Sequence, residues 1–328
     1  MFNILVSRSR WVLLIVGVMT WTILASLASG NVEVFSMAQE KKITVYLTKP
    51  APNAGEGGVL RLELNAAQPS SSTVTEIVTG LTGPENIACG PDRRLYVQDV
   101  VRVGSGFVSR IVRYNKDGST PQVIIKEDPA IRAYAMTFAS NGDLYFGAFG
   151  SQFGGIARLK GADPANPIER VIPTQTLKYG PGAIAFINAG PFKGDLLIVD
   201  SGRSSGRILR AKAPDFSDIT DFAFEASSFR PSGVAVNSKG EVFVAHFHQS
   251  DGRVYRYSPD GSRQDTIDAI NFANQLAIDS TDTVWMTNAV FFSNGSIQGG
   301  LWRLAPNATS DPVLDKKVIV RGVTVCEE

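Results

Sequence analysis

The stretch GGIARLKG, residues 154–161, has five relatives in this chain, each with an arginine between apolar residues. They are GGVLRLEL from Gly57, SRIVRYNK from Ser109, GRILRAKA from Gly206, GRVYRYSP from Gly252 and GGLWRLAP from Gly299. The arginines of the six stretches, Arg61, Arg113, Arg158, Arg210, Arg256 and Arg303, are separated by 52, 45, 52, 46 and 47 residues. A recurrence of this size indicates a repeat architecture.

Short β-rich runs accompany each arginine in a constant order. Ahead of the six arginines lie ITVYLT at 43, LYVQD at 95, LYFGA at 144, LLIVD at 196, VFVAH at 242 and VWMTN at 284. Five of these runs are preceded by another, namely ENIACG at 85, YAMTFA at 134, GAIAFI at 182, SGVAVN at 232 and NQLAID at 274. Turn residues such as Asn141-Gly142-Asp143 separate them, as tight antiparallel hairpins require. A less regular run, such as TEIVTG from Thr75 or KVIVRG from Lys317, ends each unit.

Four strands per unit and six units predict an all-β fold, a six-bladed β-propeller of four-stranded antiparallel blades over residues 39–328. One blade cannot bury both of its apolar faces, so the blades must stack until the ring closes. We expect the recurrent arginines to be structural. Their stems would lie between blades while their guanidinium groups meet carbonyls or carboxylates of the adjoining sheet.

The first unit has no inner strand of its own. Either the tail GVTVCEE or the segment NVEVFSM ahead of Gln39 must supply it, and we favour the tail. The tail would bring Cys326 toward the inner strand that holds Cys89. The two cysteines would then either form a disulfide that fastens the ring or remain small buried apolar residues.

Composition restricts the classes of function. The 328 residues carry a formal net charge of +1, which gives no electrostatic footprint for nucleic acid. Two histidines and two cysteines exclude a dense disulfide framework and a Cys/His zinc cluster. The chain has no G-x-S-x-G elbow, no phosphate-binding P-loop and no paired-histidine metal motif. We expect a monomer.

The N-terminal residues predict export. Arg8 and Arg10 precede an uncharged run over residues 11–28, so residues 1–38 are either a signal peptide or an N-terminal anchor. The protein would then be secreted or periplasmic, or, if residues 11–28 are retained, membrane-anchored.

Candidate site residues lie where the first strand of a blade starts and the second ends, because these two points share one rim of the ring. The strand starts are Glu85, Tyr134, Gly182, Ser232 and Asn274, and the strand ends are Asp99, Ala148, Asp200, His246 and Asn288. Such a rim would take a small-molecule or glycan ligand, with Arg132, Tyr134, Asp99 and Asn288 as substrate-binding residues. Carboxylate and amide oxygens there could hold Ca²⁺, or they could instead satisfy backbone amides at strand ends.

His246 is the candidate general acid or base, with Asp200 as the second candidate. We expect His246 and His248 to point to opposite faces of their sheet, so that only one faces the channel. Aromatic residues are candidates for an apolar mouth, namely Tyr134, Phe149, Phe247, Phe291 and Phe292.

Three stretches, GPENIACGPDRRLYVQD, RPSGVAVNSKGEVFVAH and NQLAIDSTDTVWMTN, resemble the repeats of NHL proteins and of the SMP-30/gluconolactonase and strictosidine-synthase-like propellers. The resemblance extends from about residue 43 over almost the whole chain. The repeat style is also similar, less closely, to that of virginiamycin-lyase-like propellers, for which His246 would be the residue of interest.

The resemblance implies a divalent-cation-dependent hydrolase or lyase. In gluconolactonase-like enzymes a Glu, an Asn and an Asp at inner-strand starts hold the cation, and that Asp also transfers a proton. Glu85 matches the Glu, while Ser232 and Asn274 stand at the places of the Asn and the Asp. Glu85 and Asn274 are therefore the expected metal ligands, with Asp99, Asp200 or Asn288 as sources of further oxygens. The alternative is a non-catalytic NHL-like propeller that binds a ligand or a protein at its rim.

Overall fold

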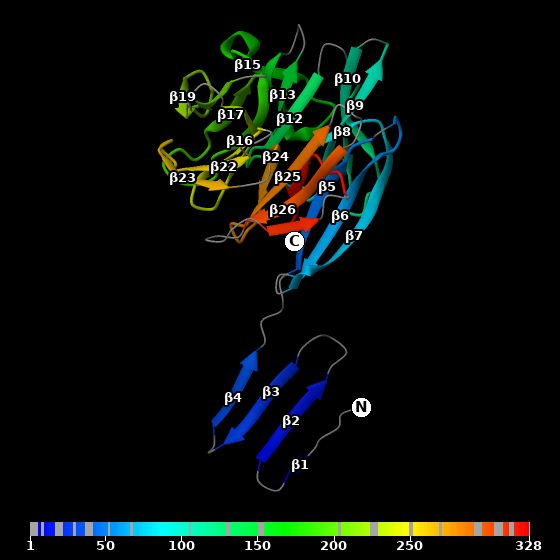
Figure 1. The fold of residues 1–328 in the computed structure, drawn as a ribbon, viewed down its shortest axis with the longest axis vertical. Helices are drawn as coiled ribbons and strands as arrows, with labels where there is room; N and C mark the ends of the chain where they lie inside the picture. Colours follow the sequence, from blue (N-terminus) through cyan, green and yellow to red (C-terminus); the bar gives the residue numbers. More distant parts are fainter. Residues whose placement is uncertain are drawn as a thin grey trace.

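A computed structural model gives the fold of the chain (Figure 1). It describes residues 6–7, 10–16, 22–28, 31–36 and 42–327, except 52, 66–67, 105, 129–131, 150–153, 203–204, 224–228, 249–251, 269–270, 292–296, 305–310 and 315–317. Within these residues the regular structure is β-strand apart from two short 3₁₀ turns, Lys160–Ala162 and Thr174–Thr176.

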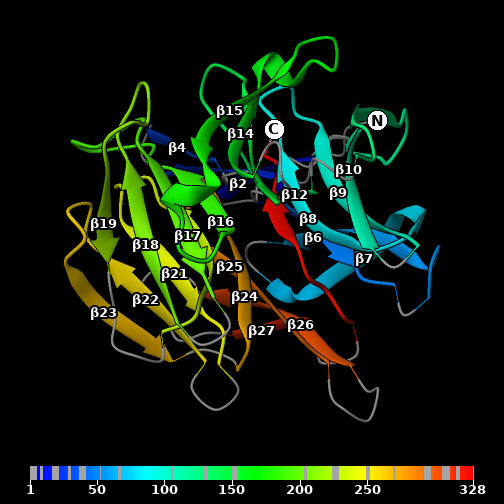
Figure 2. The same ribbon diagram turned by 90° about the horizontal axis from the view of Figure 1, so that it is seen from above.

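Six four-stranded antiparallel sheets form the predicted six-bladed propeller, seen from above in Figure 2. Blade 1 consists of β28 (Val323–Val325), β5 (Lys42–Lys49), β6 (Gly57–Asn65) and β7 (Gln68–Leu81). Blade 2 consists of β8 (Pro84–Cys89), β9 (Leu95–Val103), β10 (Gly106–Tyr114) and β11 (Gln122–Ile125). Blade 3 consists of β12 (Arg132–Phe138), β13 (Leu144–Phe149), β14 (Gly155–Leu159) and β15 (Ile168–Pro173).

The other three blades follow the same order from the inside outward. Blade 4 consists of β16 (Pro181–Phe186), β17 (Leu196–Ser201), β18 (Gly206–Ala211) and β19 (Ile219–Ala223). Blade 5 consists of β20 (Pro231–Val236), β21 (Val242–His246), β22 (Arg253–Tyr257) and β23 (Arg263–Asp268). Blade 6 consists of β24 (Ala273–Ile278), β25 (Val284–Phe291), β26 (Ile297–Leu304) and β27 (Asp311–Leu314).

Six buried clusters of apolar side chains hold the ring together, and each lies between two neighbouring blades. One cluster joins Ile111 of blade 2 to Phe146 of blade 3, and another joins Leu62 of blade 1 to Trp285 of blade 6. The second of these is the contact that only a closed ring can make. Burial of apolar faces between blades is therefore the force that closes the propeller.

The C-terminal tail closes the ring, so the favoured one of the two predicted closing segments is confirmed. β28 pairs antiparallel with β5, with Thr324 opposite Tyr46. Figure 2 shows this red strand near the middle of the ring, where it contacts both β8 and β24. Cys89 and Cys326 form a disulfide with their Cα atoms 5.4 Å apart, so the first of the two alternatives for these cysteines is confirmed.

One expected outer strand is wrong. The run KVIVRG from Lys317 was expected to end the sixth unit, but the outer strand of blade 6 is β27, Asp311–Leu314. The described part of that run, residues 318–322, leads into β28, and Val320 within it is fully buried.

The first residues form a separate sheet, drawn in blue in Figure 1. It consists of β1 (Val6–Ser7), β2 (Arg10–Val16), β3 (Thr22–Ala28) and β4 (Asn31–Ser36). Among the described residues no helix has the length and apolar character needed to cross a membrane. The assignment of residues 1–38 to an export signal or anchor stays a prediction.

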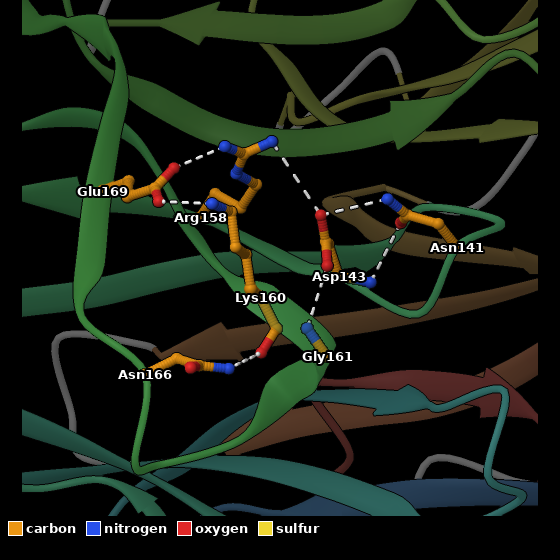
Figure 3. A network of polar contacts seen from close by, with 7 residues as sticks. All are labelled: Asn141, Asp143, Arg158, Lys160, Gly161, Asn166 and Glu169. Atoms are coloured by element: carbon orange, nitrogen blue, oxygen red, sulfur yellow. Dashed lines mark hydrogen bonds and ion pairs between the residues drawn. The ribbon is translucent and has the colours of Figure 1, made fainter.

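The six recurrent arginines lie on the third strands of the blades, and the ion pairs of five of them, Arg61, Arg113, Arg158, Arg210 and Arg256, are with carboxylates of their own blade. Figure 3 shows the network of blade 3, in which Arg158 pairs with Glu169 of β15 and lies 3.9 Å from Asp143. Asp143 also accepts a hydrogen bond from the amide of Gly161 at 2.8 Å. Arg113 with Asp92 and Arg210 with Asp195 repeat the pattern at 3.5 and 3.6 Å. For these five arginines the expected carboxylate partner in the adjoining sheet is wrong, because the third strand lies beside its own second and fourth strands.

Candidate binding site at the channel mouth

Inner-strand starts and second-strand ends lie side by side at one rim, as expected from the hairpin topology. Their registers pair Pro84 with Asp99, Pro181 with Asp200, Pro231 with His246 and Ala273 with Asn288. One further backbone hydrogen bond recurs just past these pairs. The amides of Val100, Ser201 and Phe247 donate to the carbonyls of Gly83, Gly180 and Arg230 at 2.9, 3.1 and 2.9 Å.

A cavity of about 300 Å³ opens at this rim. Four of the five predicted strand starts line it, namely Glu85, Gly182, Ser232 and Asn274. The other lining residues are Asn86, Ser201, Gly202, Arg230, Pro231, Phe247, Gln275 and Arg321. The fifth strand start, Tyr134, and the neighbouring Arg132 belong to β12, but their side chains lie outside what the structure describes.

An ion pair between Glu85 and Arg321 stands in this cavity. The Nη1 atom of Arg321 donates to Oε1 of Glu85, and both side chains are about three-quarters buried, with exposed fractions of 25% and 23%. The backbone of Arg321 is fixed on both sides. Its amide donates to the Thr48 carbonyl at 3.0 Å, and its carbonyl accepts from Oγ1 of Thr287 at 2.6 Å. The ring-closing tail therefore delivers a cation to Glu85.

The predicted metal ligands do share one cavity, but their surroundings do not suit a divalent cation. Glu85 already faces the guanidinium of Arg321, and a second cation beside it would be repelled. Asn274 contributes a neutral amide only. In the part of the chain that the structure describes, no three His, Cys, Asp or Glu side chains gather closely enough to hold a metal ion. The two predicted ligands, Glu85 and Asn274, thus offer one already paired carboxylate and one amide.

Asp200 is a buried clamp and does not line the cavity. Its carboxylate accepts hydrogen bonds from the amides of Lys178, Tyr179 and Gly180 at 2.8–2.9 Å, and from Nε of Arg207 at 3.0 Å. Burial alone would raise the pKa of Asp200, but the three amides and Arg207 together bring its pKa below the ordinary value. This is the second of the two alternatives for the strand-end oxygens.

Asp99 makes the equivalent clamp in blade 2. Its carboxylate accepts from the amides of Thr82 and Gly83 at 2.9 and 2.7 Å and from Arg110 at 2.8 Å. Arg110 lies directly opposite Asp99 on the third strand, as Arg207 lies opposite Asp200. Both carboxylates are fully buried and turned toward the backbone. Proton transfer by Asp200 and substrate binding by Asp99 stay predictions.

His246 occupies the same position in blade 5 with different surroundings. Its side chain is 3% exposed, and its ring centroid lies 5.8 Å from those of Phe229 and Tyr255 and 5.6 Å from that of His248. The expectation that the two histidines point to opposite faces is wrong, since residues two apart lie on the same side of a strand. His246 does not line the described cavity, so its acid–base role stays a prediction.

Asn288 and Ser232 each donate a hydrogen bond to a neighbouring backbone carbonyl. Asn288 donates to the Asn271 carbonyl at 3.4 Å, while its buried Oδ1 finds no hydrogen bond among the described residues. The Ser232 hydroxyl donates to the Ala273 carbonyl at 2.8 Å, which ties blade 5 to blade 6. Ser232 therefore lines the cavity while its hydroxyl proton is used by the fold.

A chain of side-chain amides runs from the cavity lining into the ring. Gln275 donates to Asn86, Asn86 donates to Gln98 at 3.0 Å, and Gln98 donates to the Ala133 carbonyl at 2.7 Å. Blades 6, 2 and 3 are thereby joined by neutral groups. Such a connected network fixes the orientation of the amides that face a ligand.

A second cavity of about 580 Å³ adjoins the first and shares Glu85, Gly182 and Ser201 with it. Its other walls come largely from the long hairpin of β9 and β10. That hairpin contributes the apolar residues Val100, Phe107 and Val108, of which Phe107 is 49% exposed.

Arg230 and Arg321, the two cationic side chains among the described residues that line the first cavity, were not predicted from the sequence. A signal for the position of both was present. Arg230 stands directly ahead of the inner strand β20, and Arg321 is separated from the inner strand β28 only by Gly322. Phe247 was expected at the mouth and does line it. The side chains of the other proposed mouth aromatics, Tyr134, Phe149, Phe291 and Phe292, lie outside the described part.

Comparisons with solved structures agree with this fold. The chain is similar to a chain of a nidogen/laminin complex, with 14% identity, a TM-score of 0.64, and coverage of 87% of this chain and 98% of that one. A gluconolactonase from Xanthomonas campestris matches with 14% identity, a TM-score of 0.54 and coverage of 84% and 87%. Regucalcin from Agrobacterium tumefaciens, a calcium-binding protein, matches with 14% identity, a TM-score of 0.50 and coverage of 84% and 90%.

The chain shares the six-bladed propeller fold of these proteins. The predicted resemblance to NHL and gluconolactonase-like propellers is thus confirmed at the level of fold. No family model matches the chain, and no curated protein matches it. At identities of this size the likeness extends to architecture and no further.

Proposed function

We propose that this chain is a binding propeller that holds a small molecule with a polar group in the cavity at its channel mouth. The observation that carries the proposal is the convergence of Glu85, Arg321, Arg230, Asn274 and Gln275 on one cavity of about 300 Å³. These residues come from three blades and the tail. A concave site with a few convergent polar groups is the usual form of a small-molecule site.

The test is a thermal-shift screen with sugar acids, sugar lactones, amino acids and short fatty acids. Some members of the panel should stabilise the wild-type protein, and that effect should disappear in Asn274→Tyr, which fills the cavity. Val123→Tyr, which adds the same ring at an outer-strand position that is 43% exposed, should retain it. Stabilisation that survives in Asn274→Tyr would place the binding site elsewhere and contradict the proposal.

Cation-dependent hydrolysis of a lactone or ester is the finer activity that the resemblance implies. The similar fold of gluconolactonase and regucalcin supports it at the level of architecture. The ion pair of Glu85 with Arg321 favours binding without a metal ion, because a cation could reach Glu85 only by displacing the guanidinium. Calcium titration calorimetry, combined with a gluconolactone hydrolysis assay, separates the two functions. Calcium-dependent turnover that is lost in Glu85→Gln would make the protein an enzyme of this type.

Export is proposed on the sequence of residues 1–38 alone, where two arginines precede an uncharged run. N-terminal sequencing of the protein recovered outside the cytoplasm tests it. A mature N-terminus between residues 28 and 42 is the expected result for a cleaved signal. Retention of residues 11–28 with recovery in the membrane fraction would indicate the anchor instead.

A further inference from the structure

We infer that the ligand of this site is an amphipathic carboxylate, whose anionic head binds at Arg230 and whose apolar part lies along Val100, Phe107 and Val108. The inference rests on the proposed function and specifies the chemistry of its ligand. Two independent features carry it, namely an arginine where other blades have glycine and an apolar wall in the adjoining cavity.

The position of Arg230 is occupied by glycine in three other blades. The carbonyl of Arg230 accepts a hydrogen bond from the first residue after the second strand, and the carbonyls of Gly83, Gly180 and Gly322 accept the equivalent bond. The backbone at this position therefore forms its hydrogen bond without needing a side chain. Arg230 adds a guanidinium at the cavity that the fold does not require.

Within the described part of the chain the charge of Arg230 has no carboxylate partner, whereas that of Arg321 is matched by Glu85. Among the residues that the structure describes, no carboxylate lies within ion-pair distance of Arg230. Its guanidinium carbon lies 5.5 Å from the centre of the Phe247 ring. A contact with a ring face leaves the in-plane N–H groups of a guanidinium available, and two such groups match the two oxygens of a carboxylate. The first cavity therefore favours an anionic head.

The second cavity favours an apolar body on the same ligand. Val100, Phe107 and Val108 form an apolar wall there, and the ring of Phe107 is half exposed to water. A ligand that covers this ring would gain the free energy of burying apolar surface. The two cavities share Glu85, Gly182 and Ser201, so a single extended molecule can reach from Arg230 to Phe107.

The experiment is isothermal titration calorimetry with octanoate, octanamide and acetate. Octanamide keeps the chain and removes the charge, while acetate keeps the charge and removes the chain. The wild-type protein should bind octanoate about tenfold or more tightly than either, as expected for a charge-assisted bidentate contact added to apolar burial. Arg230→Gln should abolish the preference for octanoate over octanamide, and Phe107→Ser should abolish the preference for octanoate over acetate.

Two control variants match these substitutions. Lys239→Gln removes a positive charge from an exposed turn of blade 5, and Val103→Ser shortens a 54% exposed apolar side chain of the β9–β10 hairpin that does not line the cavity. Both should bind octanoate like the wild type. A circular dichroism spectrum of each variant checks that the propeller is folded.

Three results would overturn the inference. They are equal affinity for octanamide and octanoate, unchanged octanoate affinity in Arg230→Gln, and no octanoate binding by the wild-type protein. In each case the proposed function stands if some compounds of the thermal-shift panel stabilise the wild-type protein but not Asn274→Tyr. It fails separately if that variant retains every stabilising effect.

Discussion

The carboxylates Asp200 and Glu85 lie near the same rim, and each has an arginine partner, yet they belong to different kinds of structure. Asp200 is fully buried, holds three backbone amides and pairs with Arg207, only seven residues away in the sequence. Glu85 is partly exposed in a cavity and pairs with Arg321, 236 residues away. The Arg158 network of Figure 3 is of the first kind, since its partners lie within one blade.

The difference shows that the presence of an acid–arginine pair does not by itself indicate a binding site. Pairs within one blade satisfy strand ends and hold the repeated fold, and they recur because the blades recur. The pair that crosses the ring closure opens onto the cavity. Its existence depends on the tail reaching blade 1.

The largest expected effect tests the contacts across the ring closure, which join residues far apart in the sequence. The double variant Cys89→Ser and Cys326→Ser should lower the free energy of unfolding by about 4 kcal/mol, because the disulfide shortens the unfolded chain across a loop of 237 residues. Urea unfolding measures the loss. A reducing agent should have the same effect on the wild-type protein and none on the variant, and equal urea midpoints for variant and wild type would show that closure does not depend on the bond.

The next effect tests the contacts within a single blade. Asp200→Ala should cost about 3 kcal/mol at neutral pH, because it leaves three amides and a partly buried guanidinium without their acceptor. Since the pKa of Asp200 is lowered in the folded protein, its contribution is complete above the unfolded value of about 4 and is lost as pH falls through the folded value. The difference from the wild type should therefore shrink below about pH 4.

Urea unfolding at several pH values measures both parts of this prediction. Asp221→Ala is the matched control, because Asp221 also contacts Arg207, at 3.2 Å, but its side chain is 61% exposed. That control should cost less than about 0.5 kcal/mol. A difference between Asp200→Ala and the wild type that is the same at neutral and acid pH would mean that the carboxylate is not a charged clamp.

The smallest effect concerns the network of blade 3. Glu169→Gln should lower stability by about 0.5 kcal/mol, since Glu169 is 34% exposed and Arg158 keeps its approach to Asp143. Thermal unfolding at low and high salt measures it, and the small loss should vanish at high salt. A loss several times larger would place this pair with the buried clamps.

The sequence alone predicted most of the fold because the signals for it are local. Alternating apolar residues, turn glycines such as Gly142 and Gly240, and the spacing of the six arginines each lie within one unit. The missing inner strand of the first unit left two candidates for ring closure, the tail and the segment ahead of Gln39, of which the tail was favoured. The run from Lys317 was misassigned because an apolar run can serve equally as an outer strand or as the lead into a closing strand.

The candidate site was predicted in position and less well in its residues. Glu85, Gly182, Ser232 and Asn274 were placed at the rim by strand register and do line the cavity. The position of Arg321 just ahead of the closing strand was a signal, but its pairing with Glu85 could not be predicted, because no local pattern tells which side chain meets a carboxylate 236 residues away. The directions of Asp99 and Asp200 were equally hidden, since a strand-end acid can face the channel or its own backbone amides.

The sequence by itself determined six equivalent β units and the rim at which their variable residues gather, because hydrogen bonding and apolar alternation act between near neighbours. Only the tertiary structure decided which of those residues face a ligand. Closing the ring brings the tail beside blade 2 and leaves Glu85, Arg321 and Arg230 around one cavity. Such contacts depend on distances across the ring, which no local pattern encodes.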